Sequence, residues 1–505
     1  GRMTSVTDTN DETTSYAYDD ANNLLSITYP DSKVVQHEYN KMGSRTKLTY
    51  TDSSYIEYTY DDLERIYQVK DQNGNVLAQY TNDELRRTRL DYLNGTYATY
   101  NYNDADWVTA LYNTKQNQGD ISSFTYTHDK AGNRATMVTT AGTHAYTYDD
   151  IYQLTQVDYP SGHPYSDKTY NLSDVGNRTS VVNGGTVSYT HNELNEYTAV
   201  GGSTYTSDLR GNLTSDGSQS YAYDLDNRLT GVGQSISYAY DPFGKRIQKT
   251  ISGSTTKYIH SADQIVEEWE GTTLARKYVF GVGIDEPLVM VTSDGSKYYY
   301  HFDALGSVRN LTDSSGATAT SYEYDVYGAF TLSGSSHGNA YAFTGRQWDG
   351  ESSLYYYRAR YYLPAVGRFI QTDPTNYKDG PNLYCYVKNN AVNMVDPSGL
   401  ACGPGVVGDF VIQDTFFSTA CEAHDHCYEQ CHRGDPDGKE KCDNQFHDDA
   451  MSICDDLPAD NLFEKYIKGN CYVLAEIFYG AVDTLGGISY ESNQAEACKC
   501  PSYYD

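Results

Sequence analysis

The sequence predicts an all-β repeat body followed by a small α-helical domain that is held together by disulfides. Three observations support this fold class. The 505 residues include 53 Tyr and 42 Gly but only 13 Phe and 6 Met, a composition that favours strands and turns over helices. A Tyr-rich motif recurs along the first part of the chain at a step of about twenty residues. Of the 10 cysteines, all but Cys385 follow Leu400, so the two parts of the chain are stabilised in different ways.

The repeat unit is a strand of alternating apolar and polar residues, a turn, and a second strand. One hairpin cannot bury its apolar face alone, so neighbouring units are expected to form one long sheet. We interpret the Tyr and Asp residues of the motif as scaffold, with the Asp providing turn chemistry. Copies of the motif and its variants stand at Tyr18-Asp19, Tyr39-Asn40, Tyr60-Asp61, Tyr80, Tyr102-Asn103, Tyr148-Asp149, Tyr223-Asp224, Tyr240-Asp241 and Tyr324-Asp325.

The overall charge and hydropathy exclude some function classes. A net charge of −31 argues against binding to nucleic acid and against electrostatic docking on an anionic membrane. The sequence has no apolar run of about eighteen residues, so we expect no transmembrane segment, and we recognise no signal peptide. Because Gly1 stands within a repeat and no initiator methionine precedes it, we interpret the chain as a fragment or a processed product.

The region that follows the repeats carries a series of ordered motifs. They are Tyr355–Tyr362, Gly367-Arg368-Phe369, Asp373-Pro374, Asn382-Leu383-Tyr384 and Asp396-Pro397-Ser398-Gly399-Leu400. Together with the repeats, they resemble the Rhs family over roughly residues 10 to 400. The resemblance implies a repeat shell over residues 1–330, an Rhs-associated core over 331–400, and a hollow β-cocoon that encloses a C-terminal toxin.

The same resemblance implies that the chain cuts itself between Leu400 and Ala401. Two carboxylates, one protonated and one ionised, can activate water and protonate a leaving amine. Asp373 and Asp396 stand in the matching motifs, and Arg368 is near them in sequence to hold charge. The alternative is that both Asp-Pro pairs only start turns; given the family motifs, we favour self-cleavage.

Two helices are expected in the tail, over residues 420–431 and about 441–454. Their facing stripes can bring His424 and Asp443 together, so that the imidazole takes a proton from water while the carboxylate orients it. Asp425 points about 100° away from His424 on a helix, which suits it to hold a cation instead. A hard cation such as calcium prefers several oxygen ligands, and a Gly-rich loop at residues 401–405 offers backbone carbonyls.

These tail motifs resemble those of secreted phospholipase A2, over about residues 401 to 455, within an assigned domain of 401–505. They are Cys402-Gly403-Pro404-Gly405, Cys421-x-x-His424-Asp425-x-Cys427-Tyr428 and Cys442-Asp443-x-x-Phe446. The resemblance implies that His424 is the general base and Asp443 its orienting partner. It also implies a calcium site formed by Asp425 and the carbonyls of Ala401, Gly403 and Gly405, with disulfides Cys402–Cys421 and Cys427–Cys442.

Two alternatives concern single residues of the tail. Asp448 competes with Asp443 as the partner of His424, but five residues along a helix it projects about 140° away, and we favour Asp443. A zinc cluster is the second alternative, since Cys and His residues recur closely in this segment. Zinc leaves the Gly-rich loop and the second motif unexplained. Its ligands would be Cys421, His424, Cys427 and Cys431.

The sequence therefore predicts an Rhs-type effector that releases a calcium-dependent phospholipase A2 acting on the glycerophospholipids of target-cell membranes. The family resemblance implies interbacterial competition, an immunity protein, delivery by a type VI secretion spike, and action outside the cell or in the periplasm. The alternative is a non-enzymatic YD-repeat adhesion or recognition protein whose tail is stabilised by disulfides or zinc.

Overall fold

The computed structural model describes residues 2–8, 11–83, 86–281 and 283–400. The chain divides into two compact units, Gly1–Phe410 and Val411–Asp505, and all of the described residues belong to the first. The predicted phospholipase A2-like domain, residues 401–505, lies outside the described residues. The domain boundaries predicted at residues 330 and 400 stay predictions.

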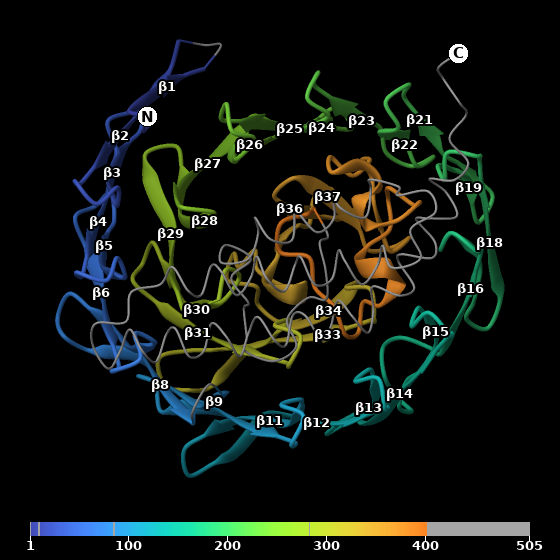
Figure 1. The fold of residues 1–505 in the computed structure, drawn as a ribbon, viewed down its shortest axis with the longest axis horizontal. Coiled ribbons are helices and arrows are strands. Elements are labelled where there is room, and N and C mark those ends of the chain that lie inside the picture. The colour runs from blue at the N-terminus through green and yellow to red at the C-terminus, as the bar shows by residue number, and fades with distance from the viewer. Residues whose placement is uncertain (1, 9–10, 84–85, 282, 401–505) are drawn as a thin grey trace, which may run out of the picture. The chain divides into compact units, whose positions relative to one another are not determined.

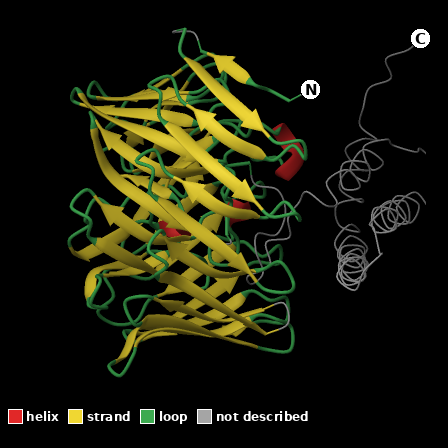
Figure 2. Ribbon diagram, turned by 90° about the vertical axis from the view of Figure 1, so that its left-hand side faces the viewer, coloured by secondary structure: helices red, strands yellow, loops and turns green. Residues whose placement is uncertain are grey.

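The described part of the first unit is built of β-strands apart from three short 3-10 turns, as the repeat pattern predicts (Figures 1 and 2). Its first twenty strands form one antiparallel sheet, called the wall below, in which each strand pairs with the next along the chain. The wall strands are β1 (Ser5–Thr7), β2 (Thr13–Tyr18), β3 (Leu24–Thr28), β4 (Val34–Tyr39), β5 (Arg45–Thr49), β6 (Tyr55–Tyr60), β7 (Ile66–Asp71), β8 (Val76–Asp83), β9 (Arg86–Tyr92), β10 (Thr96–Tyr102), β11 (Val108–Lys115), β12 (Gly119–His128), β13 (Arg134–Thr139), β14 (Gly142–Tyr148), β15 (Leu154–Asp158), β16 (Lys168–Leu172), β17 (Arg178–Val182), β18 (Thr186–His191), β19 (Tyr197–Val200) and β20 (Ser203–Thr204).

The chain continues into three further sheets, which have two, twelve and four strands. The two-stranded sheet comprises β21 (Thr206–Ser207) and β22 (Leu213–Ser215). The twelve-stranded sheet comprises β23 (Tyr221–Tyr223), β24 (Leu229–Val232), β25 (Ile236–Tyr240), β26 (Arg246–Ile251), β27 (Ser254–Ser261), β28 (Gln264–Glu270), β29 (Thr273–Phe280), β30 (Pro287–Thr292), β31 (Lys297–Phe302), β32 (Val308–Thr312), β33 (Thr318–Tyr324) and β34 (Phe330–Gly334). The four-stranded sheet comprises β35 (Gln347–Asp349), β36 (Leu354–Tyr357), β37 (Arg360–Leu363) and β38 (Arg368–Phe369).

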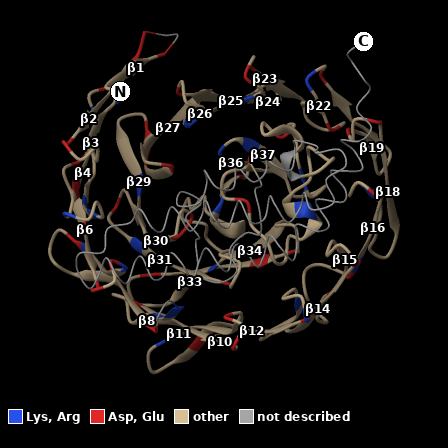
Figure 3. Cartoon of the chain, in the orientation of Figure 1, with Lys and Arg blue, Asp and Glu red and all other residues tan. Residues whose placement is uncertain are grey.

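The helices of the described residues are three short 3-10 turns: η1 (Phe343–Gly345), η2 (Asn376–Asp379) and η3 (Val387–Asn389). Within this part of the chain, none of them has the length and hydrophobicity that a membrane crossing needs. Acidic and basic residues are interspersed along the strands and turns (Figure 3).

The turn that follows each Tyr-Asp pair is closed by the Asp side chain. In the copy between β6 and β7, Asp61 Oδ1 accepts hydrogen bonds from the backbone N–H groups of Leu63 and Arg65, both at 3.0 Å. The Tyr60 hydroxyl donates to the carbonyl of Arg45, at 2.7 Å, in the preceding repeat. Both contacts are structural, in agreement with the scaffold interpretation of the motif.

The wall and the twelve-stranded sheet are joined by buried tyrosines. The Tyr50 hydroxyl donates to the carbonyl of Tyr278 at 2.9 Å, and the Tyr92 hydroxyl donates to that of Tyr300 at 2.7 Å. Alternate residues are buried on several wall strands, as on β6, where Ile56 is buried beside the exposed Glu57. Apolar burial on one face of these strands therefore helps to hold the sheets together.

The last described segment crosses the turns of the wall, and its asparagines make the contacts. Asn389 Nδ2 donates to the carbonyl of Gly176 at 2.8 Å, and Asn393 Oδ1 accepts from the backbone N–H of Arg134 at 2.8 Å. Asn382 Nδ2 donates to the carbonyl of Val175 at 3.1 Å. These contacts hold the segment that leads to Leu400 against the repeats.

Candidate active site

The end of the described chain lies against the tip of the β36–β37 hairpin. The backbone N–H of Ala359, in the hairpin turn, donates to the carbonyl of Ser398 at 3.2 Å. The side chains of Leu354 to Tyr357 and of Arg360 to Leu363 are all buried. A buried, regular hairpin of this kind gives a site a rigid support.

Arg360 brings the two predicted carboxylates together. Its Nη2 atom lies 2.8 Å from Asp373 Oδ2 and 3.5 Å from Asp396 Oδ2. All three side chains are buried, with exposed fractions of 1% for Arg360, 6% for Asp373 and 2% for Asp396. The guanidinium carbon also lies 3.7 Å from the centre of the Phe369 ring, which fixes the plane of the group. Residues far apart in sequence thus form one compact charged cluster.

Each carboxylate uses its other oxygen to close a local turn. Asp396 Oδ1 accepts from the backbone N–H groups of Gly399 and Leu400, at 2.8 and 3.1 Å. Asp373 Oδ1 accepts from the backbone N–H of Thr375 at 2.8 Å and from its hydroxyl at 2.6 Å. Both residues therefore start turns, as the alternative interpretation expects, and their Oδ2 atoms still meet at one guanidinium.

Arg368, which we expected to hold charge beside these carboxylates, has other partners. Its guanidinium donates to the carbonyl of Asn195 at 2.9 Å and to Asn177 Oδ1 at 2.9 Å. The physical reason is strand geometry: adjacent residues of β38 point to opposite faces, and Phe369 takes the face toward Arg360. Arg360, and not Arg368, is the cation between the two carboxylates.

The alternation of the strands is a signal that points to Arg360. Tyr362 pairs with Phe369 in the β37–β38 register, and Arg360 lies two residues before Tyr362, on the same face of β37. Recognising this from the sequence requires the hairpin register, which no local motif specifies.

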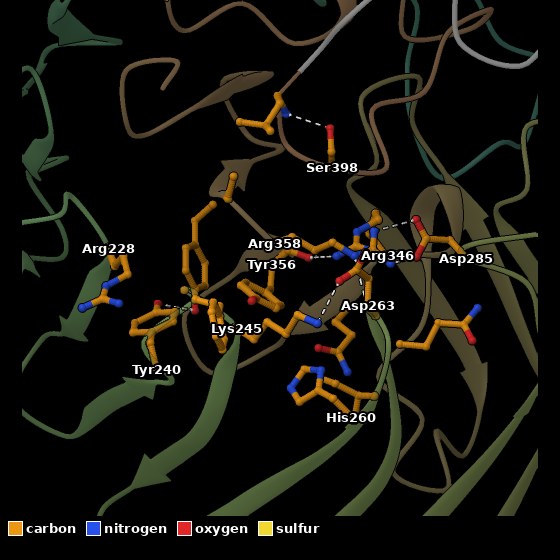
Figure 4. Close-up of a pocket in the computed structure, with 18 of the residues that line it drawn as sticks. Arg228, Tyr240, Lys245, His260, Asp263, Asp285, Arg346, Tyr356, Arg358 and Ser398 are labelled. Atoms are coloured by element: carbon orange, nitrogen blue, oxygen red, sulfur yellow. Dashed lines mark hydrogen bonds and ion pairs between the residues drawn. The ribbon is translucent and has the colours of Figure 1, made fainter. Parts of the chain in front are cut away.

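A cavity of about 300 Å³ lies beside Leu400 and Ser398. Figure 4 shows Arg346 and Arg358 converging on Asp285, and Lys245 directed toward Asp263. The Lys245 ammonium lies 3.0 Å from Asp263 Oδ1.

The cavity also contains groups whose protonation is altered by their surroundings. Burial disfavours the charged form of Arg358, but the nearby Asp285 and Asp263 carboxylates, together with Tyr356, outweigh this effect and raise the pKa of Arg358. Burial lowers the pKa of His260, another residue of the cavity, to about 4. The cavity is therefore polar and charge-paired on the side of Asp285.

The predicted lipid-hydrolysing site lies outside the described residues. This holds for His424, Asp443 and Asp425, and for both predicted disulfides, Cys402–Cys421 and Cys427–Cys442. It holds also for Ala401, Gly403 and Gly405. Of the predicted cut bond, the structure describes the Leu400 side.

The wall of successive antiparallel strands, the Tyr-Asp turns, and the β36–β37 hairpin that lies inside the ring of wall strands (Figure 1) define a YD-repeat β-shell. The Teneurin YD-shell family model matches residues 132–392, and the chain belongs to this family. The RHS Repeat model matches residues 1–34 and 18–55. The model of the Group XII secretory phospholipase A2 precursor matches residues 389–504.

Curated relatives match part of the chain. The chain is 32% identical over 296 residues to the tRNA3(Ser)-specific nuclease WapA of Bacillus spizizenii, covering 56% of this chain and 11% of WapA. It is 28% identical over 207 residues to the double-stranded DNA deaminase toxin A of Burkholderia cenocepacia, covering 35% of this chain and 14% of that protein. The chain thus spans a small part of the length of these relatives, and it is related to Rhs/YD-repeat toxins.

A solved structure shows the same fold. The chain is 18% identical to a chain of the Tc holotoxin pore of Photorhabdus luminescens, with a TM-score of 0.62. The likeness covers 79% of this chain and 23% of that one.

Proposed function

We propose that this chain is an Rhs-type effector that cuts its own backbone between Leu400 and Ala401 and thereby releases its C-terminal part as a toxin. The observation that carries the proposal is the meeting of Asp373 and Asp396 at Arg360, in the described residues next to Leu400. Enzymes that hydrolyse a bond with two carboxylates commonly hold these acidic side chains close together in a buried site.

The proposed reaction uses one carboxylate as base and the other as acid. The base takes a proton from water as the water oxygen bonds to the Leu400 carbonyl carbon. The acid gives a proton to the nitrogen of Ala401 as the C–N bond breaks. The products are a carboxylate at Leu400 and an amine at Ala401. Arg360 holds the two Asp side chains together, and the intramolecular arrangement supplies the high effective concentration that such a reaction needs.

Single Asp-to-Asn substitutions test this step, with intact mass as the measurement of the cut. Asp373→Asn and Asp396→Asn keep the shape of each side chain but remove its acid–base function, so each should slow the cut by about 100-fold or more. Asp241→Asn is the matched control, because Asp241 also precedes a proline and also closes a turn, through the N–H of Phe243 at 2.9 Å. Asp241→Asn should be cut like the wild type.

Two results would contradict the proposal. One is a wild-type chain that stays intact, which would favour a non-enzymatic adhesion protein. The other is a cut after Leu400 at the wild-type rate in Asp373→Asn or Asp396→Asn. A break inside an Asp-Pro pair, as plain acid hydrolysis produces, is distinguished from the proposed cut by its mass.

We further propose that the released part is a calcium-dependent phospholipase A2. The match of residues 389–504 to the Group XII phospholipase A2 model and the His424-Asp425 motif support this proposal. In it, His424 takes the proton from water and Asp443 orients the imidazole. The oxygen donors of Asp425, Ala401, Gly403 and Gly405 fit a hard cation, and calcium, when bound, polarises the ester carbonyl.

Several features of this proposal follow from the resemblance alone. They are the disulfides Cys402–Cys421 and Cys427–Cys442, the phospholipid substrate, the immunity protein, the secretion spike and action in the periplasm or outside the cell. A disulfide-bonded, calcium-dependent enzyme suits an oxidising, calcium-containing compartment.

The test is hydrolysis of phospholipid vesicles by the full chain, with calcium or with a chelator. His424→Ala should reduce the rate by about 100-fold or more, and His432→Ala, a nearby histidine outside the motif, should retain it. Lipid hydrolysis that persists in chelator or in His424→Ala would contradict the mechanism. Because relatives are named as a tRNA nuclease and a DNA deaminase, tRNA and double-stranded DNA are assayed in parallel. Turnover of either nucleic acid without lipid hydrolysis would overturn the proposal.

A further inference from the structure

The hairpin turn of residues 358–360 contacts the backbone of the segment before Leu400 in strict order. Arg358 Nη1 donates to the carbonyl of Pro397. The backbone N–H of Ala359 donates to the carbonyl of Ser398 at 3.2 Å. Arg360 Nε donates to the carbonyl of Gly399 at 2.5 Å. Three consecutive residues of the turn thus hold three consecutive carbonyls, and none of these contacts involves a side chain of the held segment.

Arg358 is built into this position at a conformational cost. Its φ is 56°, in the left-handed region that non-glycine residues rarely adopt. Asp285 holds its guanidinium through Oδ1 at 2.8 Å and Oδ2 at 3.2 Å. Arg358 Nε also donates to the carbonyl of Asp263 at 3.2 Å. Arg358 thus has a strained backbone, and Asp285 and Asp263 hold its side chain where it contacts Pro397. This combination indicates that Arg358 positions the segment and does not only form a turn.

The held segment lies so close to the hairpin that position 399 has no room for a side chain. Gly399 has a φ of 73°, and a Cβ atom there would lie 2.1 Å from the carbonyl oxygen of Tyr357. The close approach at Gly399 therefore prevents the segment from sliding by one residue along the turn, because any other residue placed at this point would collide with Tyr357.

We propose that the turn Arg358–Arg360 is a template that reads the backbone of residues 397–399 and so determines which peptide bond is cut, with Arg358 as its positioning residue. The inference rests on the proposed self-cleavage. It adds that the contacts to the three held carbonyls determine the position of the cut, and that the side chain of Leu400 does not. Misplacing a scissile bond by about 1 Å can cost about 100-fold in rate, so losing one of three contacts should be measurable.

The first test compares Arg358→Ala with Arg346→Ala. Both variants remove one guanidinium from Asp285, since Arg346 Nη1 donates to Asp285 Oδ1 at 2.6 Å, but Arg346 donates on its other side to Tyr356. The rate of the cut should fall at least about tenfold more in Arg358→Ala than in Arg346→Ala, at similar melting temperatures. Arg358→Lys, which keeps a donor for the Pro397 carbonyl, should recover part of the rate. Equal losses of cutting rate in the two Ala variants would show that Arg358 has only a structural role, and this result would overturn the inference.

The second test asks where the cut falls, by intact mass. Leu400→Ala should be cut after residue 400, because the backbone contacts of residues 397–399 are unchanged. Gly399→Ala should stay intact, because its Cβ meets the hairpin. A cut that moves to another bond in Leu400→Ala, or a Gly399→Ala chain cut like the wild type, would overturn the template.

Failure of the template is distinguishable from failure of self-cleavage itself. If the template fails, the wild type is cut after Leu400, Asp396→Asn is not, and Arg358→Ala is cut like Arg346→Ala. If self-cleavage fails, the wild type stays intact, or Asp396→Asn is cut as the wild type is.

Discussion

The tyrosines that end the wall repeats and the tyrosines of the β36–β37 hairpin make different kinds of hydrogen bond. In the wall, the tyrosine that ends a repeat donates to a carbonyl in the preceding repeat. Tyr39, Tyr60 and Tyr102 each reach 15 residues back. In the hairpin, tyrosines reach distant segments: the Tyr362 hydroxyl donates to Tyr327, and the Tyr361 hydroxyl pairs with that of Tyr240, 121 residues away. The tyrosines that end the wall repeats thus make the same local contact in several copies, whereas the hairpin tyrosines make long-range contacts that occur once.

This difference indicates where the molecule tolerates change. A wall tyrosine that ends a repeat, such as Tyr60, is partly exposed, and the loss of one copy leaves its neighbours in place. The hairpin tyrosines are fully buried within a cluster of aromatic rings. Because Arg360 begins β37 in that cluster, a disturbance of the hairpin also disturbs the candidate site.

The largest expected effect is the loss of one hairpin tyrosine compared with one wall tyrosine. Tyr362→Ala empties a fully buried site and should lower the free energy of unfolding by about 3–5 kcal/mol. Tyr60→Ala, at a partly exposed site, should cost about 1–2 kcal/mol. Denaturant midpoints of both variants check this order. Equal shifts would show that the hairpin is no more critical than a repeat.

The next effect is a loss of stability in acid that comes from buried histidines. Burial lowers the pKa of His260 from 6.5 to about 4. The unfolded chain therefore binds more protons than the folded one between pH 6.5 and 4. The contribution of His260 to the free energy of unfolding is therefore complete above pH 6.5 and falls as the pH drops from 6.5 to 4. The total loss for this residue approaches about 3 kcal/mol.

Melting temperatures measured against pH test this assignment. His260→Gln keeps a polar side chain next to the carbonyl of Arg246 and should flatten the curve between pH 6.5 and 4. His191, which is exposed on wall strand β18, provides the control: His191→Gln should leave the curve unchanged. Identical curves for His260→Gln and the wild type would contradict the assignment.

The repeats could be predicted from the sequence because each unit carries its own signal. Alternation specifies the strands, and the Asp of each Tyr-Asp pair specifies the turn, so Asp61 and its neighbours behave as predicted. Sequence motifs likewise identify Asp373 and Asp396, because each stands in an ordered motif. They do not identify Arg360, because the face of β37 that meets Phe369 depends on strand register. Nor do they identify the contact between Arg358 and Asp285, because the two residues are 73 positions apart in the sequence.

The smallest expected effect concerns two aspartates that close turns in the same way, one in the wall and one at the site. Asp61→Ala should cost about 1 kcal/mol, since it removes acceptors from two backbone N–H groups. Asp61→Asn should lower the stability much less, because an asparagine closes the same turn in another repeat. There, Asn40 Oδ1 accepts hydrogen bonds from the backbone N–H groups of Met42 and Ser44, both at 2.9 Å. Neither variant should change the rate of the cut.

Asp396 closes its turn through Oδ1 as well, with Gly399 and Leu400 as donors. Asp396→Asn should therefore keep the turn and nearly all the stability, as in the wall, but stop the cut, because an amide beside Arg360 cannot exchange the proton. Thermal melting combined with intact mass separates the two properties. A parallel loss of stability and cutting in Asp396→Asn would mean that Asp396 acts only through its turn, like any aspartate of the wall.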